Sequence, residues 1–280
     1  MEKRKTPNLL LKRMITIGFF VIVFLFVIIA LFPFVWGFIT SLKPTSEVNN
    51  FSVSFSELSF SAYWYIINTF PFLRWLLNSF VIGIGVTALN MLFNSWAGYA
   101  LARINFPGRQ FLFLSILAMM MIPGVITMVP MFMILVKLGW VNTYQGLIIP
   151  FSFSLFNIFL MRQFFLSIPV SLEEAATIDG LGRFGIFFKI ILPISKPALA
   201  VQFILTFVGN WNSFIWPNLL CRTQEMYTLP IGLNSFYGQY VQFWNQVLAG
   251  AMLLTFPILV LFIIFQKQFI EGMASSGIKD

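Results

Sequence analysis

The chain lacks histidine altogether, contains one cysteine, Cys221, and has charged side chains at only 9% of its 280 positions. Without histidine, the commonest metal ligand and general base is missing, and one cysteine cannot build a disulfide framework. No G-x-x-x-x-G-K-[ST] segment occurs, so the chain has no P-loop for nucleotide phosphates. We therefore expect no metal site, no cofactor bound by this chain and no enzymatic activity of its own.

Apolar residues dominate instead, at 59% hydrophobic and 18% aromatic, which is the composition of an integral membrane protein. The net charge of +8 would suit a nucleic-acid partner, but the cations are scattered at the ends of apolar segments and form no single stripe. We therefore expect the lipid bilayer as a partner and no nucleic acid.

Six segments are long and apolar enough to cross a hydrocarbon core of about 30 Å, which needs roughly 20 residues. They lie near 15–39, 77–101, 111–135, 144–166, 198–220 and 246–266. The predicted fold class is all-α, a polytopic membrane protein with six transmembrane helices. The expected divisions are an N-terminal segment 1–14, a first helix 15–39, an extracytoplasmic segment 40–76, a core domain 77–266 and a tail 267–280.

The cations are distributed unequally between the two sides of this topology. With the N-terminus inside, thirteen of the 17 Lys and Arg residues fall on the cytoplasmic side and four, at 43, 74, 137 and 222, on the outer side. Positive charge favours the cytoplasmic face. This predicts a multi-pass protein of the cytoplasmic (inner) membrane with both termini in the cytoplasm.

The cytoplasmic loop 163–197 is predicted to form short helices. Ser171 followed three residues later by Glu174 has the spacing of a capping box. Glu173 and Glu174 in the first turn suit the positive end of the helix dipole, and Gly180 and Gly182 are expected to end the helix.

On this helix, Leu172 and Ile178 are predicted to point away from a face of small residues. A second amphipathic piece, 184–191, returns the chain to the bilayer; Pro193 is expected to break it, and Pro197 to open the fifth span. By their i, i+1, i+4, i+5 spacing, the small face comprises Ala175, Ala176, Asp179 and Gly180.

Glu174-Ala175-Ala176, three residues, Gly180, nine residues and Ile190-Ile191-Leu192-Pro193 together resemble the EAA motif of ABC-transporter permease subunits. Stretches at 78–80, 98–103, 106–109 and 228–233 are similar to the carbohydrate-importer branch, of MalG-like type. The resemblance implies a type I ABC importer permease fold, in which the loop docks in a cleft of an ATPase. Without it, a solvated loop helix would be the default interpretation. The implied coupling residues are Glu173, Glu174, Ala175, Ala176, Asp179, Gly180, Ile190, Leu192 and Pro193.

The same resemblance implies a set of partners for this chain. They are a second, MalF-like permease subunit, a homodimeric ABC ATPase and an extracytoplasmic sugar-binding protein. ATP and magnesium would be bound by the partner ATPase, and this chain would form half of the pathway for a sugar or oligosaccharide.

Polar residues within the apolar segments are the candidate substrate pathway. Neutral amides and hydroxyls beside aromatic rings suit an uncharged sugar, although Asn and Ser also join helices in membranes and Trp marks the interfacial belt. The family commonly has an acidic residue where Ser213 stands, which weakens the transfer of any sugar contact. Pro123 and Gly124 predict a kink or an unwound stretch in the third span. The candidates are Asn210, Trp211, Asn212, Ser213, Phe214 and Trp216 of the fifth span, with Asn90 and Asn94 of the second.

Other functional classes fit the sequence less well. A self-sufficient secondary transporter ordinarily has an ionisable residue at membrane depth, and these spans have none. An intramembrane enzyme would need a histidine, paired carboxylates or an activated nucleophile. Within the importer class, another polyhydroxylated solute such as glycerol phosphate remains open.

Overall fold

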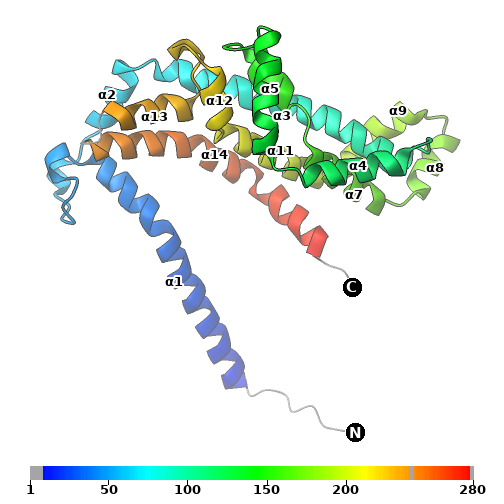
Figure 1. Ribbon diagram of the computed structural model, residues 1–280. Helices are drawn as coiled ribbons and strands as arrows, with labels where there is room; N and C mark the ends of the chain where they lie inside the picture. Colours follow the sequence, from blue (N-terminus) through cyan, green and yellow to red (C-terminus); the bar gives the residue numbers. More distant parts are fainter. Residues whose placement is uncertain (1–8, 240–242, 278–280) are drawn as a thin grey trace. The chain divides into compact units, whose positions relative to one another are not determined.

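The structure is a computed structural model that describes residues 9–239 and 243–277, and in these ranges it is helical without strands (Figure 1). The chain divides into two compact units, described here separately. Unit 1 comprises Met1–Ile66 and Gln239–Leu253, and unit 2 comprises Ile67–Gly238 and Leu254–Asp280. Helices α2 (Ser61–Thr69) and α14 (Trp244–Gly277) contribute residues to both units, and α13 (Leu229–Gln239) lies in unit 2 except for its last residue.

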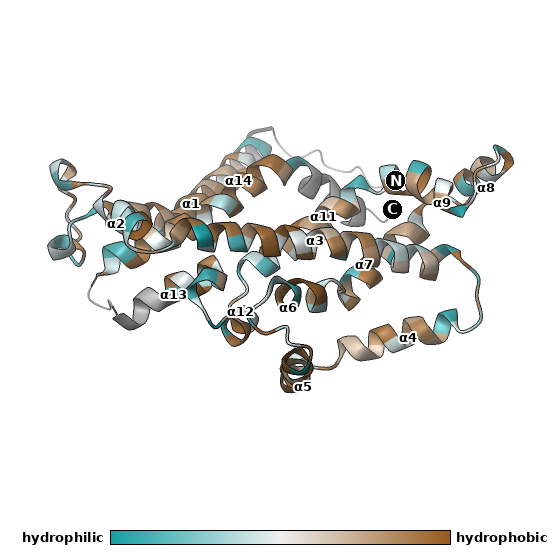
Figure 2. Ribbon diagram, turned by 90° about the horizontal axis from the view of Figure 1, so that it is seen from above, coloured by the Kyte–Doolittle hydropathy of each residue, from teal (hydrophilic) through white to brown (hydrophobic). Residues whose placement is uncertain are grey.

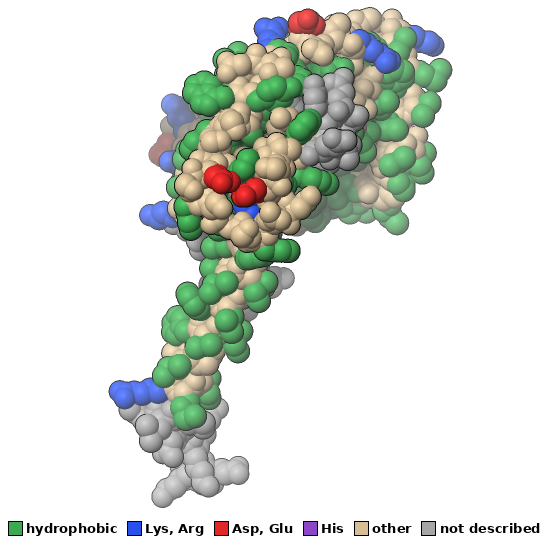
Figure 3. Space-filling view, turned by 90° about the vertical axis from the view of Figure 1, so that its left-hand side faces the viewer, with side chains coloured by type: hydrophobic (Ala, Val, Ile, Leu, Met, Phe, Trp, Pro, Cys, Tyr) green, Lys and Arg blue, Asp and Glu red, His purple; other side chains and the backbone are tan. Residues whose placement is uncertain are grey.

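The main element of unit 1 is the long helix α1 (Leu9–Leu42), which extends beyond the predicted 15–39. No charged residue occurs between Arg13 and Lys43, and apolar side chains are exposed along the whole span (Figure 3). A helix that is apolar all round belongs in lipid or against another membrane helix. Two short 3₁₀ turns follow α1, η1 (Thr45–Glu47) and η2 (Phe55–Glu57).

The core of unit 2 is formed by helix α3 (Phe72–Arg103), which packs along α7 (Leu155–Ser167) and α11 (Lys196–Trp211). Gly98 allows the close approach of α3 to α7, since a Cβ there would lie 2.8 Å from Cβ of Met161. Small residues at such crossings let membrane helices approach without a hydrophobic driving force between them.

Three helix pairs are bent sharply within unit 2. Helices α4 (Arg109–Met120) and α5 (Gly124–Lys137) meet at 101°, because Pro123 adopts an extended conformation before α5 (Figure 1). The predicted third span, 111–135, is therefore a pair of helices, and the kink expected at Pro123 is confirmed. The stretch Tyr144–Phe151, made of α6 (Tyr144–Ile148) and the 3₁₀ turn η3 (Ile149–Phe151), meets α7 at 41°.

The bounds of the fifth predicted span, 198–220, need correction. Helix α11 ends at Trp211, and residues 212–214 separate it from the short helix α12 (Ile215–Leu220). The segment that is long and apolar enough to form a span consists instead of Arg183–Ile194 and Lys196–Trp211, which are bent by 79° relative to each other. Within the described residues, three single helices are long and apolar enough to cross a membrane, and up to six spans result if each bent pair counts as one.

The remaining elements of unit 2 are short. They are α8 (Ser171–Ile178), α9 (Arg183–Ile186), the π-helical turn η4 (Phe187–Ile191), α10 (Leu192–Ile194), the 3₁₀ turn η5 (Gln224–Met226) and α13 (Leu229–Gln239). Hydropathy colouring separates the strongly apolar α5 from the more polar α8 (Figure 2).

Candidate functional site

The 163–197 loop contains α8, α9, η4 and α10, and the first of these begins differently from the prediction. Ser171 is the first helical residue, and Val170 precedes it at the N-cap in an αR conformation without a side-chain cap bond. The Val170 carbonyl accepts the amides of Glu173 and Glu174. The predicted Ser171–Glu174 capping box is therefore wrong, because the chain is already helical one residue earlier.

Helix α8 ends at Gly180, as expected. Gly180 has φ +84°, its amide donates to the Thr177 carbonyl at 3.0 Å, and the amide of Leu181 donates to the Ala176 carbonyl at 3.0 Å. These two bonds form a Schellman motif. Asp179 is the C-cap, and Gly180 is the left-handed residue that follows it. A Cβ at 180 would meet no atom within 4 Å, so the requirement for glycine comes from the backbone alone.

Glu173 ties this helix to the end of α3. Its Oε1 lies 2.9 Å from Nε of Arg103 as an ion pair without hydrogen-bond alignment, and Oη of Tyr99 donates to its Oε2 at 3.2 Å. The Arg103 and Glu173 side chains are only 9% and 15% exposed. Nη2 of Arg103 also donates to the carbonyls of Phe165 and Ile168 at the end of α7. We call this set the Arg103–Glu173 clasp; it fastens α8 to both α3 and α7.

Ala176 lies inside the protein. It is buried in a cluster with Phe165, Ile186, Phe187 and Ile191, so the prediction that it shares an outward face with Ala175 is wrong. The physical reason is that Glu173, one turn earlier, already directs this side of α8 towards α3.

The outward face of the loop combines predicted and unpredicted residues. Glu174, Ala175, Asp179 and Gly180 are exposed. Two large apolar side chains are exposed beside them, Ile178 at 88% and Phe184 at 77%. Neither was predicted from the sequence as part of this surface. Two bulky apolar residues exposed on one short polar loop were the available signal for a protein contact.

The end of the motif returns the chain to unit 2's core. Ile190 and Leu192 pack against the same cluster as Ala176, and Pro193 is exposed in the first turn of α10. The π-helical turn η4 lies just before the bend into α11, and such turns frequently occur at functional sites. Pro197 is in the first turn of α11, as predicted.

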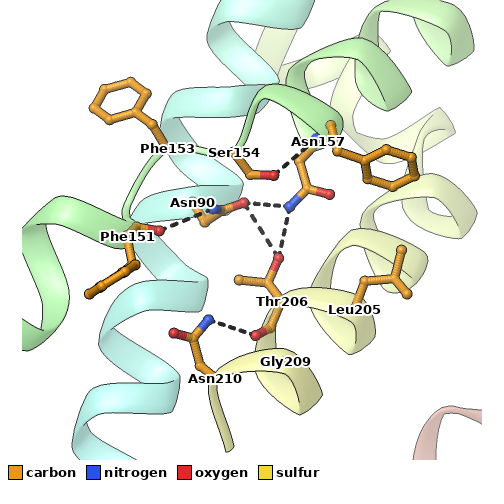
Figure 4. A pocket seen from close by; sticks show the side chains of 10 residues that line it. Asn90, Phe151, Phe153, Ser154, Asn157, Leu205, Thr206, Gly209 and Asn210 are labelled. Atoms are coloured by element: carbon orange, nitrogen blue, oxygen red, sulfur yellow. Dashed lines mark hydrogen bonds between the residues drawn. The ribbon is translucent and has the colours of Figure 1, made fainter. Parts of the chain in front are cut away.

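A polar cavity of about 300 Å³ lies where α3, α7 and α11 meet (Figure 4). Its lining combines amides and hydroxyls with phenylalanine rings, and none of its ten residues carries a charge. The lining residues are Asn90, Phe151, Phe153, Ser154, Phe156, Asn157, Leu205, Thr206, Gly209 and Asn210.

A hydrogen-bonded network supports this cavity. Nδ2 of Asn157 donates to Oδ1 of Asn90 at 2.8 Å and to Oγ1 of Thr206 at 2.9 Å (Figure 4). Asn94 also donates to Oδ1 of Asn90, and Nε2 of Gln202 donates to the Asn90 carbonyl at 3.1 Å. The network joins three helices through neutral groups, which are far cheaper to bury in a membrane than charges.

The sequence did not identify Asn157, Thr206 and Gln202 as members of this site. The signal was present, because Gln202, Thr206 and Asn210 recur every four residues and so form one polar stripe on α11.

The predicted pathway residues of the fifth span fall in different places. Asn210 lines the cavity, and with Ser213 and Trp216 it also lines a smaller one of about 20 Å³. Asn212 is exposed at the C-cap of α11, and Phe214 is half-buried against a hydrophobic cluster.

Trp211 is the clearest departure from the predicted pathway. It is fully buried, its Nε1 donates to the Leu254 carbonyl at 3.1 Å, and its ring contacts Phe80 edge-on with centroids 4.8 Å apart. Of the second-span candidates, Asn90 lines the cavity, whereas Asn94 is buried beside it and its Oδ1 accepts the Ser154 amide.

The family model described as "Binding-protein-dependent transport system inner membrane component" matches residues 94–275, which include the loop and every residue that lines the cavity except Asn90. The chain belongs to this family. Its membrane character, its helical fold and its role as a permease subunit follow from that membership.

Named relatives match along nearly the whole chain. The arabinooligosaccharides transport system permease protein AraQ of Halalkalibacterium halodurans is 40% identical over 99% of each chain. The trehalose/maltose transport system permease protein MalG of Thermococcus litoralis is 31% identical, covering 91% of this chain and 94% of its own. The sn-glycerol-3-phosphate transport system permease protein UgpE of Pectobacterium atrosepticum is 32% identical over 89% and 92%.

A solved structure shares the fold. A chain from a bacterial ABC transporter involved in the import of the acidic polysaccharide alginate superposes with a TM-score of 0.80 at 27% identity, covering 92% of this chain and 97% of that chain. The architecture is therefore that of an ABC importer permease.

Proposed function

We propose that this chain forms half of the transmembrane pathway of an ATP-driven importer for a neutral sugar or oligosaccharide. The observation that carries the proposal is that α3 bears both sites: Asn90 lines the polar cavity, and Arg103 fastens the loop. The two positions are 13 residues apart, which is about 20 Å along a helix. A displacement of α8 would thus reach the cavity through one rigid element.

The loop supplies a surface for an ATPase. Ile178 and Phe184 project apolar side chains from a short, firmly held piece of chain, and Glu174 and Asp179 lie exposed beside them. A helix that presents apolar anchors in this way fits a groove in a partner. In this proposal the partner is a homodimeric ABC ATPase that binds ATP and magnesium.

The cavity favours an uncharged substrate. Amides and hydroxyls can pair with sugar hydroxyls, and the C–H faces of a sugar ring pack on aromatic rings such as Phe151 and Phe153. A relative named for glycerol phosphate keeps that solute as the second candidate. Phosphate sites use cations, helix N-termini or both. The N-terminal turn of α7 lines this cavity but no cation does, so the neutral sugar is preferred.

The rest of the assembly is proposed on the family relationship and the charge distribution. A second permease subunit would complete the pathway, and an extracytoplasmic binding protein would deliver the sugar. Both termini would lie in the cytoplasm, since that orientation puts thirteen of the 17 cations inside.

The proposal is tested by purifying the tagged chain from its native membrane in mild detergent and identifying what accompanies it by mass spectrometry. A stoichiometric Walker-A ATPase and a second permease are expected, and the reconstituted complex should take up sugar only with ATP. Isolation of the chain alone, still able to move solute in liposomes, would make it a secondary transporter instead.

A further inference from the structure

A buried lysine stands at the end of α1. Lys43 is only 2% exposed, and within the described residues no carboxylate forms an ion pair with it. Its Nζ donates to the carbonyls of Asn50 at 2.6 Å and Ser52 at 2.9 Å, and lies 4.7 Å from the centroid of the Trp36 ring. Burying an ammonium group is costly unless it is well coordinated, so these contacts fix the loop that supplies them.

The two carbonyls flank Phe51, so Lys43 determines where that ring is presented. The Phe51 ring stacks on Trp36 with centroids 5.6 Å apart, and Trp36 stacks on Phe32 at 6.2 Å. Phe51 is nevertheless 85% exposed, and Phe55 in the next turn is 82% exposed. The 43–58 loop therefore folds back onto α1 at Phe51, and it exposes a second phenylalanine, Phe55, four residues further on.

The level of these rings along α1 can be estimated from the sequence. The candidate span Lys12–Leu42 is longer than the hydrocarbon core. Counted from Arg13, the last cation before the uncharged run, about 20 residues at 1.5 Å each cover the 30 Å core and reach Pro33, so the rest of the helix extends into the interfacial layer. Trp36 then lies in the interfacial layer, where Trp is enriched. Phe51 stacks on this residue, so it lies at the same level.

We propose that the 43–58 loop is a membrane-interface anchor that inserts Phe51 and Phe55 into the boundary between headgroups and acyl chains. It would do so on the membrane face opposite the N-terminus. The occupant is the bilayer itself, because the exposed rings continue the apolar surface of a membrane-spanning helix. The loop offers Glu47 and Glu57 and no cation besides the buried Lys43, so attachment does not depend on anionic lipids. This inference rests on the membrane span and is independent of what is transported.

The test places a nitroxide label at position 55 of the assembled complex, in phosphatidylcholine nanodiscs and with Cys221→Ala as background. Phe55→Cys leaves the Lys43, Trp36 and Phe51 contacts intact. Collision rates with oxygen, which concentrates in lipid, and with a water-soluble nickel chelate report the environment. We expect the label at 55 to collide more often with oxygen than with the nickel chelate, and a label at the exposed control position, Asn49→Cys, to collide more often with the nickel chelate. More frequent collisions with the nickel chelate at 55 would overturn the proposed membrane anchor. So would a label that neither reagent reaches, as at a protein contact.

Lys43→Met tests how the loop is positioned, because methionine keeps most of the apolar stem and removes the ammonium group. With the label at 55, we expect the oxygen preference to be lost. Lys137→Met, at the exposed end of α5, serves as the matched control and should leave it unchanged. An unaltered oxygen preference in Lys43→Met would refute the positioning role of Lys43. Should that variant fail to assemble, the label in the unaltered loop still decides the main proposal.

Discussion

Two polar clusters on the same helix, α3, are built from different chemistry. Around Asn90, within the helix, amides and hydroxyls share neutral hydrogen bonds, whereas at its end Arg103 and Glu173 form an ion pair. Charges at membrane depth cost several kcal/mol, and near a helix end that cost falls because water is accessible. The comparison teaches that the cavity can contact a neutral solute at low cost, while the clasp concentrates strong interactions where a moving partner would act.

The largest effect is expected from breaking the clasp. Arg103→Met leaves the nearly buried Glu173 without its cation, and removing one partner of a buried pair typically costs about 3–5 kcal/mol. We expect sugar uptake by proteoliposomes to be lost while the chain still inserts in the membrane.

Arg109→Met is the matched control for the clasp. Arg109 donates to the side chain of Asn105 and to the Ile104 carbonyl, and within the described residues it forms no ion pair. Uptake should stay near the wild-type rate in this variant. Equal losses in the two variants would show that the clasp has no special role.

Gly180 tests the geometry of the loop without touching the ion pair. An L-residue at φ +84° costs about 1–2 kcal/mol, so Gly180→Ala should reduce uptake, and a bulky residue such as Trp should abolish it by also blocking close docking. Gly182→Ala is the control, because φ at 182 is −75° and a Cβ there meets nothing within 4 Å. Uptake rates at equal membrane abundance give the comparison, and wild-type uptake by Gly180→Trp would exclude a coupling role.

The neutral cluster should respond differently from the clasp. Asn210→Ala removes an amide at the cavity edge that, among the described residues, is bonded only within its own helix, to the Thr206 carbonyl. We expect a raised KM for sugar uptake, about tenfold if one hydrogen bond worth about 1.4 kcal/mol is lost, with little change in thermal stability. Asn212→Ala, at an exposed position two residues on, should change neither quantity. An unaltered KM in Asn210→Ala would place the substrate elsewhere.

The smallest effect is expected for Tyr99→Phe, which deletes one neutral donor to Glu173 and keeps the ion pair. A typical hydrogen bond contributes about 0.5–1.5 kcal/mol net, and this one is long at 3.2 Å and lies beside an ion pair that is kept, so the lower end applies. Uptake should fall only slightly, and the melting temperature of the complex should drop by a few degrees at most. A loss of uptake as large as that of Arg103→Met would mean that the Tyr99 hydroxyl secures α8 as much as the Arg103 cation does.

The sequence allowed prediction of the elements that depend on local pattern. The apolar runs locate the candidate spans, although the bounds of the fifth were wrong, and Gly180 locates the end of α8, because a left-handed C′ residue is usually glycine. Ser171 was misassigned because the αR conformation of Val170 depends on how the preceding chain leaves α7. Trp211 was misassigned because its partners, Phe80 and Leu254, lie far away in the sequence.

The clasp and the amide network lay beyond sequence reasoning for the same reason. Arg103 and Glu173 are 70 residues apart, and Asn90, Asn157 and Thr206 come from three helices. Their charges and amides were visible in the sequence, but their pairing requires the packing of α3 against α7 and α11, which small residues such as Gly98 permit.

Photocrosslinking from the tip of the 163–197 loop tests whether this loop docks on an ATPase. A photoreactive amino acid replaces Ile178, the most exposed apolar residue of α8, in cells that make the whole transporter. We expect an adduct between this chain and a Walker-A ATPase subunit. Adducts with lipid alone, or with another region of the same chain, would contradict it.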